Sequence, residues 1–178
     1  MKKYIALLRG INVGGHKSIK MTQLVKLMQS LGFENVTSYI QSGNICFESA
    51  LGDYKQLEKN IEQKISTEFG FDAPVIVISA DELKAIIAKN PFKIEDLTSL
   101  YVTFLKSCPE HQLIHNFNAF AFTPDKIVAS ESAVYSLIVN GYAQTKFNNL
   151  FIEKKLKVLA TTRNWKTVLR LLDMSTSS

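Results

Sequence analysis

The order of short apolar runs and amphipathic segments constrains the fold of this chain most strongly. Residues 4–8 form a short apolar run typical of a buried strand, and apolar residues recur at helical steps along 21–31. Continued to residue 78, this alternation predicts the order strand, helix, strand, strand, helix, strand. The predicted segments are strands 4–8, 36–40, 45–47 and 75–78 and helices 21–31 and 53–70. This order is the split βαβ, or ferredoxin-like, arrangement.

The rest of the chain predicts a second α+β half. Ser79 and Glu82 form a capping box that opens a helix over 80–90, and Pro91 ends it. The segments predicted beyond it are strands at 100–105, 119–122, 126–130 and 133–139 and helices at 146–157 and 163–173. We therefore expect an α+β protein with a ferredoxin-like subdomain over 1–90 and a smaller α+β subdomain over 91–178. No internal repeat is evident in the sequence.

Composition and local sequence argue against a membrane-spanning or secreted protein. Among 178 residues, 46% are hydrophobic and 21% are charged, which is ordinary for a globular chain with a buried core. No apolar run approaches the roughly 20 residues that span a bilayer, and the first residues do not form a signal peptide. Cys46 and Cys108 form no CxxC pair. We therefore expect a cytoplasmic protein with no membrane partner.

The net charge of +5 is distributed unevenly along the chain. Residues 1–33 carry +6, residues 34–140 carry −6 and residues 141–178 carry +5. Basic segments of this kind are common on solvated surfaces, and they become informative only where they also carry unusual local chemistry.

The loop predicted over residues 9–17 is the first candidate binding site. Gly10 and Gly15 have the spacing of a phosphate-binding P-loop, but His16 occupies the lysine position, and the dinucleotide-binding glycine pattern is also absent. What the loop offers is backbone N–H groups and polar side chains after a buried strand. The residues that we assign to a ligand are Arg9, Asn12, Gly14, Gly15, His16 and Lys17. The alternative is that the glycines merely permit a tight turn.

Two predicted helix starts carry a cation where the helix dipole disfavours one. With Thr162 as the N-cap, Arg163 and Asn164 fall in a first helical turn, and with Thr145 as the N-cap, Lys146 does the same. A bound anion at each helix start would account for both cations. The alternative is that Lys146 and Arg163 point to solvent or pair with an acid elsewhere.

Other kinds of site find little support. His111 and His115 lie four residues apart, but no carboxylate or cysteine cluster accompanies them, so we expect no metal and no cofactor. Nothing marks Cys46 as a nucleophile. The predicted strand around Cys46 lacks the aromatic pair of an RNA-recognition motif.

Several motifs resemble those of the bacterial domain of unknown function 1697 family. They are Leu7-Leu8-Arg9-Gly10-Ile11-Asn12-Val13-Gly14-Gly15-His16, Met21-x-x-Leu24, Leu31-Gly32-Phe33, Tyr39-x-x-Ser42-Gly43-Asn44, Lys146 and Thr161-x-Arg163-Asn164-Trp165. The resemblance implies a two-part α+β protein with a ferredoxin-like N-terminal half, and it implies no activity. It adds Ser42 and Asn44 to the candidate ligand-binding residues.

The sequence therefore favours a protein that binds an anionic ligand in a basic cleft between its two halves. The expected partner is a phosphate-bearing small molecule or a nucleic acid backbone. A first alternative is an enzyme that acts on an anionic substrate with His16 as its acid or base. A second is a structural or protein-interaction module. The ligand, any reaction and the oligomeric state are left open.

Overall fold

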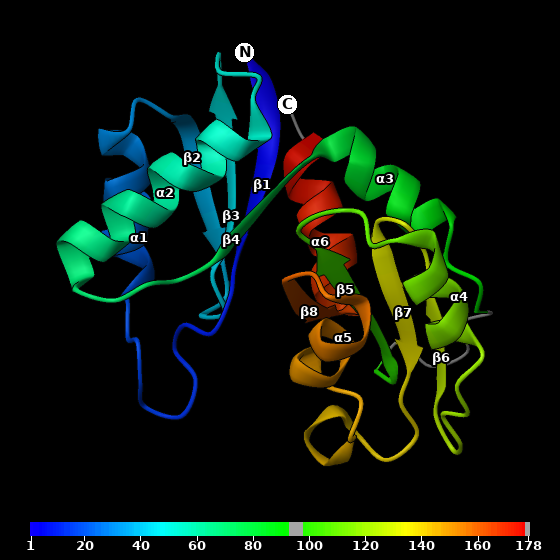
Figure 1. Ribbon diagram of the computed structural model, residues 1–178. Helices are drawn as coiled ribbons and strands as arrows, with labels where there is room; N and C mark the ends of the chain where they lie inside the picture. Colours follow the sequence, from blue (N-terminus) through cyan, green and yellow to red (C-terminus); the bar gives the residue numbers. More distant parts are fainter. Residues whose placement is uncertain (93–97, 177–178) are drawn as a thin grey trace. The chain divides into compact units, whose positions relative to one another are not determined.

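The computed structural model describes residues 1–92 and 98–176, which form two compact units (Figure 1). Unit 1 comprises Met1–Lys84 together with the end of the last helix from Leu171 onward. Unit 2 comprises Ala85–Arg170. Each unit has its own four-stranded antiparallel sheet, which confirms the predicted α+β class.

Unit 1 has the split βαβ order that the sequence predicts. Its elements are β1 (Lys2–Leu8), α1 (Met21–Ser30), β2 (Glu34–Tyr39), β3 (Asn44–Ser49), α2 (Tyr54–Phe69) and β4 (Val75–Ser79). The strands lie in the order β2-β3-β1-β4, and every neighbouring pair is antiparallel. Strand β1 therefore lies inside the sheet, which explains why residues 4–8 are entirely apolar.

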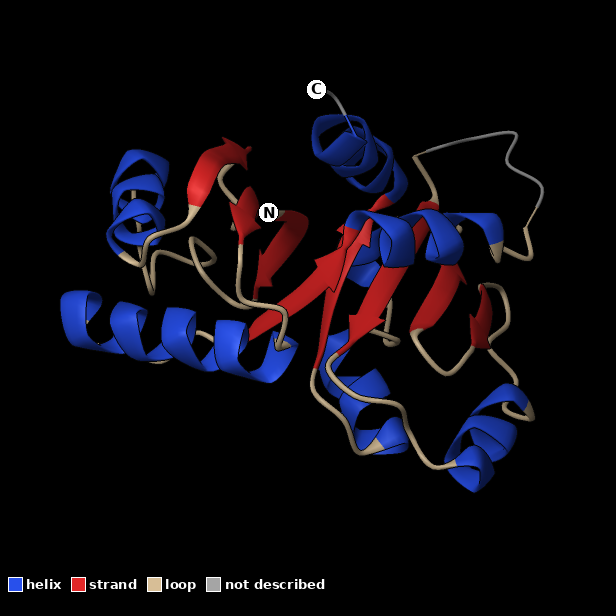
Figure 2. Ribbon diagram, turned by 90° about the horizontal axis from the view of Figure 1, so that it is seen from above, coloured by secondary structure: helices blue, strands red, loops and turns tan. Residues whose placement is uncertain are grey.

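The core of unit 1 lies between one face of this sheet and its two long helices (Figure 2). Alternate residues of β1, namely Tyr4, Ala6 and Leu8, point into it, as the two-residue repeat of a strand requires. They share the core with Leu24 of α1 and Leu57 of α2. The amphipathic spacing of both helices thus serves burial on one side of the sheet.

Local side-chain chemistry sets the ends of these helices. Asp53 accepts hydrogen bonds from the backbone N–H groups of Lys55 and Gln56, and Gly70 ends α2 in the left-handed conformation at φ 74°. Ser79 and Glu82 form the predicted capping box at the start of α3 (Ala80–Ala88).

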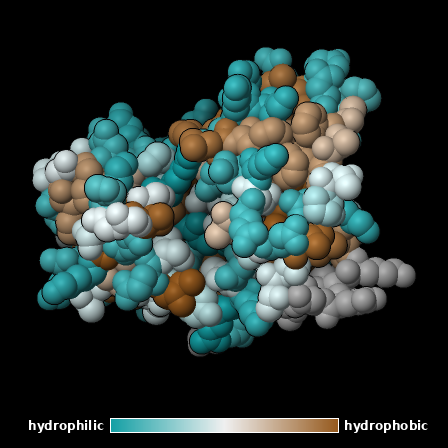
Figure 3. Space-filling model, turned by 90° about the horizontal axis from the view of Figure 1, so that it is seen from below, coloured by the Kyte–Doolittle hydropathy of each residue, from teal (hydrophilic) through white to brown (hydrophobic). Residues whose placement is uncertain are grey.

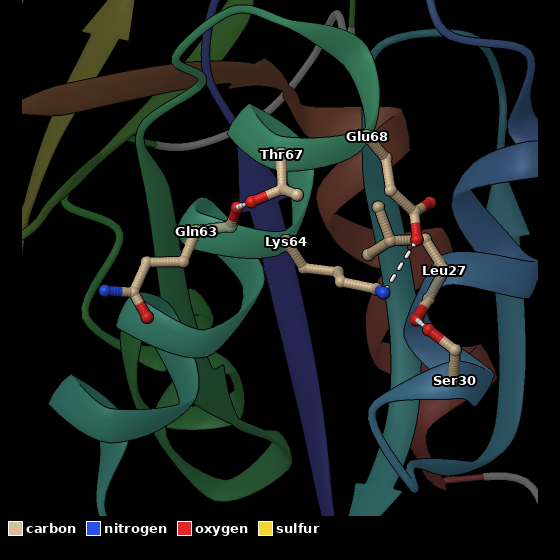
Figure 4. Close-up of polar contacts among 6 residues, drawn as sticks. All are labelled: Leu27, Ser30, Gln63, Lys64, Thr67 and Glu68. Atoms are coloured by element: carbon tan, nitrogen blue, oxygen red, sulfur yellow. Dashed lines mark hydrogen bonds and ion pairs between the residues drawn. The ribbon is translucent and has the colours of Figure 1, made fainter.

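Polar side chains on α1 and α2 form contacts outside the apolar core (Figure 4). Lys64 and Glu68 form an i,i+4 ion pair at 2.8 Å, and Ser30 donates to the carbonyl of Leu27 at 2.7 Å. Exposed pairs of this kind add only a few tenths of a kcal/mol to helix stability, so burial of the apolar face dominates.

Unit 2 repeats the strand order of unit 1. Its elements are β5 (Leu100–Leu105), α4 (His111–Asn118), β6 (Lys126–Ala129), β7 (Ala133–Leu137), the 3₁₀ turn η1 (Tyr142–Gln144), α5 (Asn149–Leu156) and β8 (Ala160–Asn164). The last helix, α6, spans Trp165–Thr176. The sheet order β6-β7-β5-β8 is the order of unit 1 with each strand replaced by its counterpart. The two units thus share one topology although no repeat is evident in the sequence.

The structure corrects the sequence prediction at three places in unit 2. A helix, α4, occupies 111–118, and the strand predicted at 119–122 is absent. The alternation of Phe120 and Phe122 with alanine imitates a strand, but these rings pack on each other at 5.2 Å in a loop. Strand β8 occupies 160–164, where the sequence predicts the N-cap Thr162 and the start of a helix. The helix predicted over 146–157 begins only at Asn149.

No helix in the described part of the chain is long and apolar enough to cross a membrane.

Candidate functional site

The loop after β1 folds into a small hairpin of its own. Asn12 N–H donates to the carbonyl of Lys17 at 3.1 Å, and His16 N–H donates to the carbonyl of Val13 at 3.2 Å. Both central residues of this turn, Gly14 (φ 61°) and Gly15 (φ 76°), are left-handed, as a type I′ turn requires. The two glycines are therefore explained by backbone geometry, and ligand contact by either stays a prediction.

Asn12 holds this loop in place rather than facing outward. Its side-chain amide donates to the carbonyls of Ile19 at 3.0 Å and Gln41 at 2.7 Å. Its carbonyl oxygen accepts from the N–H of Ile19 at 2.8 Å. Both N–H donors of the amide are thus engaged with backbone, and asparagine also tolerates the left-handed φ of 55° found here.

The second predicted motif forms the turn between β2 and β3, directly beside the first. The Gly43 carbonyl accepts from the N–H of Leu8 at 2.8 Å. A Cβ atom on Gly43 would lie 2.7 Å from Cβ of Leu8, so only glycine fits. The amide of Asn44, which is fully buried, donates to Ser42 Oγ at 2.9 Å and to the Tyr39 carbonyl at 3.1 Å. Ser42 and Asn44 therefore have an evident structural role in shaping this turn.

The cationic side chains of the first motif lie at the same end of the sheet. The backbone N–H of Arg9 donates to the carbonyl of Pro74 at 2.9 Å. Lys17 Nζ donates to the carbonyl of Asp72 at 2.6 Å and lies 6.0 Å from the centre of the Phe71 ring. The His16 side chain is exposed. We call this region, formed by residues 9–19, 40–43 and 71–74, the loop end of unit 1.

The helix-start interpretation of Lys146 is wrong. Lys146 precedes α5, whose N-cap is Asn148, with its Oδ1 accepting from the N–H of Phe151 at 3.2 Å. Thr145 is instead bonded to Asp125, through Oγ1 to Oδ2 at 3.0 Å. Lys146 is exposed and lines a cavity of about 230 Å³ in unit 2. Contact between Lys146 and a ligand stays a prediction.

The helix-start interpretation of Arg163 is also wrong, because Arg163 lies in β8 opposite Val102 of β5. Its side chain is buried and donates through Nη1 to Thr161 Oγ1 at 2.8 Å and to the Thr162 carbonyl at 2.9 Å. Burial lowers the pKa of Arg163 to about 10, against a smaller opposing effect of Tyr142. Asn164 supplies the first-turn acceptor of α6, through Oδ1 to the N–H of Thr167 at 2.8 Å.

Around these strand residues lies a polar network that the sequence did not reveal. Thr162 Oγ1 lies 2.7 Å from Thr103 Oγ1 and 2.5 Å from Asn149 Oδ1. The rings of Tyr101 and Tyr142 lie 4.7 Å apart. Within the sequence, the one signal for this network is that Thr162 lies inside the motif Thr161–Trp165. Thr103 and Tyr142 come from distant segments, so local patterns do not link them to Thr162.

In the described part of the chain, the histidines and Cys46 give little evidence of a metal site or a nucleophile. Within the described residues, no group of three potential metal-ligating side chains comes together. His111 instead lies 3.4 Å from Glu131 on the surface. Cys46 lines a cavity of about 360 Å³ in unit 1, but burial raises its pKa to about 11, which disfavours the thiolate.

Comparison with known proteins places the chain in a family. The model of the family described as "Protein of unknown function (DUF1697)" matches residues 1–135. The chain belongs to this family. The match confirms the family that the sequence motifs indicated, and the loop end of unit 1 lies wholly within the matched residues. The motifs at Lys146 and Thr161–Trp165 lie beyond the matched residues.

One solved structure in particular has the same fold. It is a conserved bacterial protein from Streptococcus pneumoniae, 24% identical, with a TM-score of 0.76 over 98% of this chain and 99% of that chain. No curated protein matches the sequence.

Proposed function

We propose that the chain binds an anionic, phosphate-bearing ligand at the loop end of unit 1. The observation that carries this proposal is the way Asn12 holds the loop. Because its amide fixes the base of the hairpin on Ile19 and Gln41, the turn at Gly14 and Gly15 is presented in one conformation. A preorganised loop binds a ligand with less loss of conformational entropy than a free one.

The donors at this turn suit an anion. Among the described residues, the N–H groups of Gly14 and Gly15 donate no backbone hydrogen bond within the chain. Two successive left-handed residues present N–H groups at a turn, as in small anion-binding loops of other proteins, and Lys17 belongs to the same loop. The surrounding segment, residues 1–33, carries a net charge of +6 and no acid.

A phosphate-bearing ligand also fits the cytoplasmic location that we propose. Cys46 and Cys108 are both free thiols, which suits a reducing cytoplasm, where phosphorylated metabolites and nucleic acids are abundant.

The sequence predicts a basic cleft between the two halves partly from helix-start cations at Lys146 and Arg163. Since neither cation occupies a helix start, the proposal rests on unit 1 alone.

Calorimetric titration with inorganic phosphate and with ATP tests this function. Lys17→Gln removes a cation at the loop end, and Lys26→Gln removes one from the exposed side of α1 in the same unit. We expect Lys17→Gln to weaken ATP binding by about fivefold or more, consistent with loss of a charge-assisted hydrogen bond. Lys26→Gln should leave the affinity unchanged. Equal effects of the two variants, or no heat with either ligand at millimolar concentration, refute the proposal.

A further inference from the structure

The outer side of α5 in unit 2 carries apolar rings and lysines next to each other. Four residues of this helix face inward: Ile152 and Leu156 enter the core, Asn149 contacts Thr162, and Glu153 accepts from the N–H of Ala160 at 2.8 Å. The outer side is left with Leu150, Phe151, Lys154 and Lys155, and the exposed ring of Phe120 lies against it. We call Phe120, Leu150, Phe151, Lys154 and Lys155 the phenylalanine–lysine surface.

Phe120 is held in a fixed position although it is partly exposed. Its ring centre lies 5.2 Å from that of Phe122, 5.9 Å from Phe151 and 6.4 Å from Phe147. Even so, 45% of Phe120 is accessible to solvent. Exposed apolar side chains interrupt the hydrophilic surface on one face of the molecule in Figure 3. An aromatic ring that is both oriented and exposed offers a stacking surface at little entropic cost.

A cation already lies over these rings. Lys155 Nζ lies 5.2 Å from the ring centre of Phe120 and 5.7 Å from that of Phe151. These are cation–π distances, and they place an ammonium group beside the exposed ring. A nucleotide base that stacked on Phe120 would displace the ammonium from the ring face, within reach of an adjoining phosphate.

The chain segment that carries α5 is positively charged. Lys146, Lys154, Lys155 and Lys157 are all exposed. Between residues 141 and 160 the single acid is Glu153, whose carboxylate is directed inward to the backbone of Ala160. Lysines in a last turn also stabilise the helix dipole, but that effect gives no reason for exposed apolar side chains beside them.

We propose that the phenylalanine–lysine surface binds single-stranded nucleic acid. A base stacks on Phe120, and the adjoining phosphates contact Lys154 and Lys155, which is how proteins bind single strands without sequence preference. An anionic membrane fits less well, because insertion needs several projecting apolar side chains, and here only Phe120 and Leu150 exceed one-third exposure. This proposal does not depend on the loop end of unit 1.

Fluorescence anisotropy with a labelled 12-nucleotide oligouridylate tests it on the full chain. Phe120→Leu keeps an apolar side chain but removes the ring, so we expect the affinity to fall about fivefold or more. In the double variant Lys154→Gln/Lys155→Gln, the slope of log affinity against log salt should decrease by about 1.4, the value for two phosphate contacts on a single strand. Lys166→Gln, at an exposed position of α6, is the matched control.

Two further measurements separate this proposal from its competitors. A duplex of the same length should bind more weakly than the single strand, because its bases are already stacked. Vesicles of phosphatidylserine and phosphatidylcholine should not bind; binding that Leu150→Ser abolishes while Phe120→Leu preserves it identifies a membrane surface and overturns the proposal. Oligouridylate binding that responds to Lys17→Gln but not to Phe120→Leu assigns the nucleic acid to unit 1 and also overturns it.

Discussion

At the residue scale, the motifs of the loop end are explained first by backbone geometry. Asn12 bonds three backbone groups, Gly43 leaves no room for a Cβ atom, and the fully buried Asn44 bonds Ser42 and the Tyr39 carbonyl. The motifs of this chain around Asn12 and Gly43 therefore determine the shape of two adjoining turns. Any contact with a ligand would be made by the backbone N–H groups and side chains that these turns expose.

Replacing Gly43 by alanine should destabilise the protein strongly. The new Cβ would lie 2.7 Å from Cβ of Leu8 at a φ of +73°, so both a steric clash and backbone strain arise. We expect a loss of at least about 2 kcal/mol in the free energy of unfolding, measured by urea denaturation. Gly14→Ala is the control, because it has a positive φ but open space around Cβ, and it should lose only about 1 kcal/mol. Equal losses would contradict the steric argument.

Replacing Asn12 by glycine should loosen the loop without straining it. Glycine keeps the left-handed backbone but forfeits three hydrogen bonds. We expect faster amide hydrogen exchange over residues 10–19 and a loss of about 1–3 kcal/mol in stability. Unchanged exchange in this loop would show that Asn12 does not hold it.

The two cysteines should differ sharply in reactivity. Cys46 is buried with its pKa raised to about 11, so at pH 8 almost none of it is thiolate, whereas Cys108 is exposed. Iodoacetamide should therefore alkylate Cys108 first in the native protein, and Cys46 only at higher pH or after unfolding. Mass spectrometry of the Cys108→Ser variant checks this, and rapid labelling of that variant at pH 8 would contradict it.

At the element scale, the sequence predicts every segment of unit 1, and in unit 2 it predicts β5, β6 and β7 but neither α4 nor β8. In unit 1, helix ends carry explicit signals such as Asp53, Gly70 and the Ser79–Glu82 box, and the box forms as predicted. In unit 2, two threonines before Arg163 have the chemistry of an N-cap and also the β-branched shape that favours a strand. Pairing of β8 with β5 decides between these possibilities, and that pairing joins residues about 60 positions apart.

The true N-cap of α5 gives a direct test at this scale. Asn148→Ala removes the acceptor for the N–H of Phe151 and should cost about 1 kcal/mol of stability. Lys146→Ala, two residues earlier, should leave thermal unfolding nearly unchanged because Lys146 lies outside the helix. A larger effect of Lys146→Ala than of Asn148→Ala would restore the helix start that the sequence suggested.

At the scale of the whole molecule, one topology is used twice. In each sheet the first strand of the unit, β1 or β5, has neighbours on both sides, and the second strand, β2 or β6, lies at an edge. No repeat is evident in the sequence, and the pairing of the strands reveals the common topology.

This repeated topology predicts the pattern of backbone protection. Amide hydrogens of β1 and β5 should exchange most slowly within their sheets, and those of β2 and β6 should exchange faster, because inner strands are bonded on both sides. Hydrogen exchange followed by mass spectrometry resolves these segments. If β2 were as protected as β1, an additional strand or partner would have to cover that edge.

The sequence by itself determined the α+β class, the split βαβ order of the first 79 residues and the family. The class and the order depend on local periodicity and capping, which involve residues close together in the chain. The family depends on short motifs. Only the tertiary structure decided that Arg163 is buried in a strand, that Asn12 bonds to Gln41, and that Phe120 lies against Lys155. Each of these depends on contacts between segments far apart in the chain, and periodicity carries no information about such contacts.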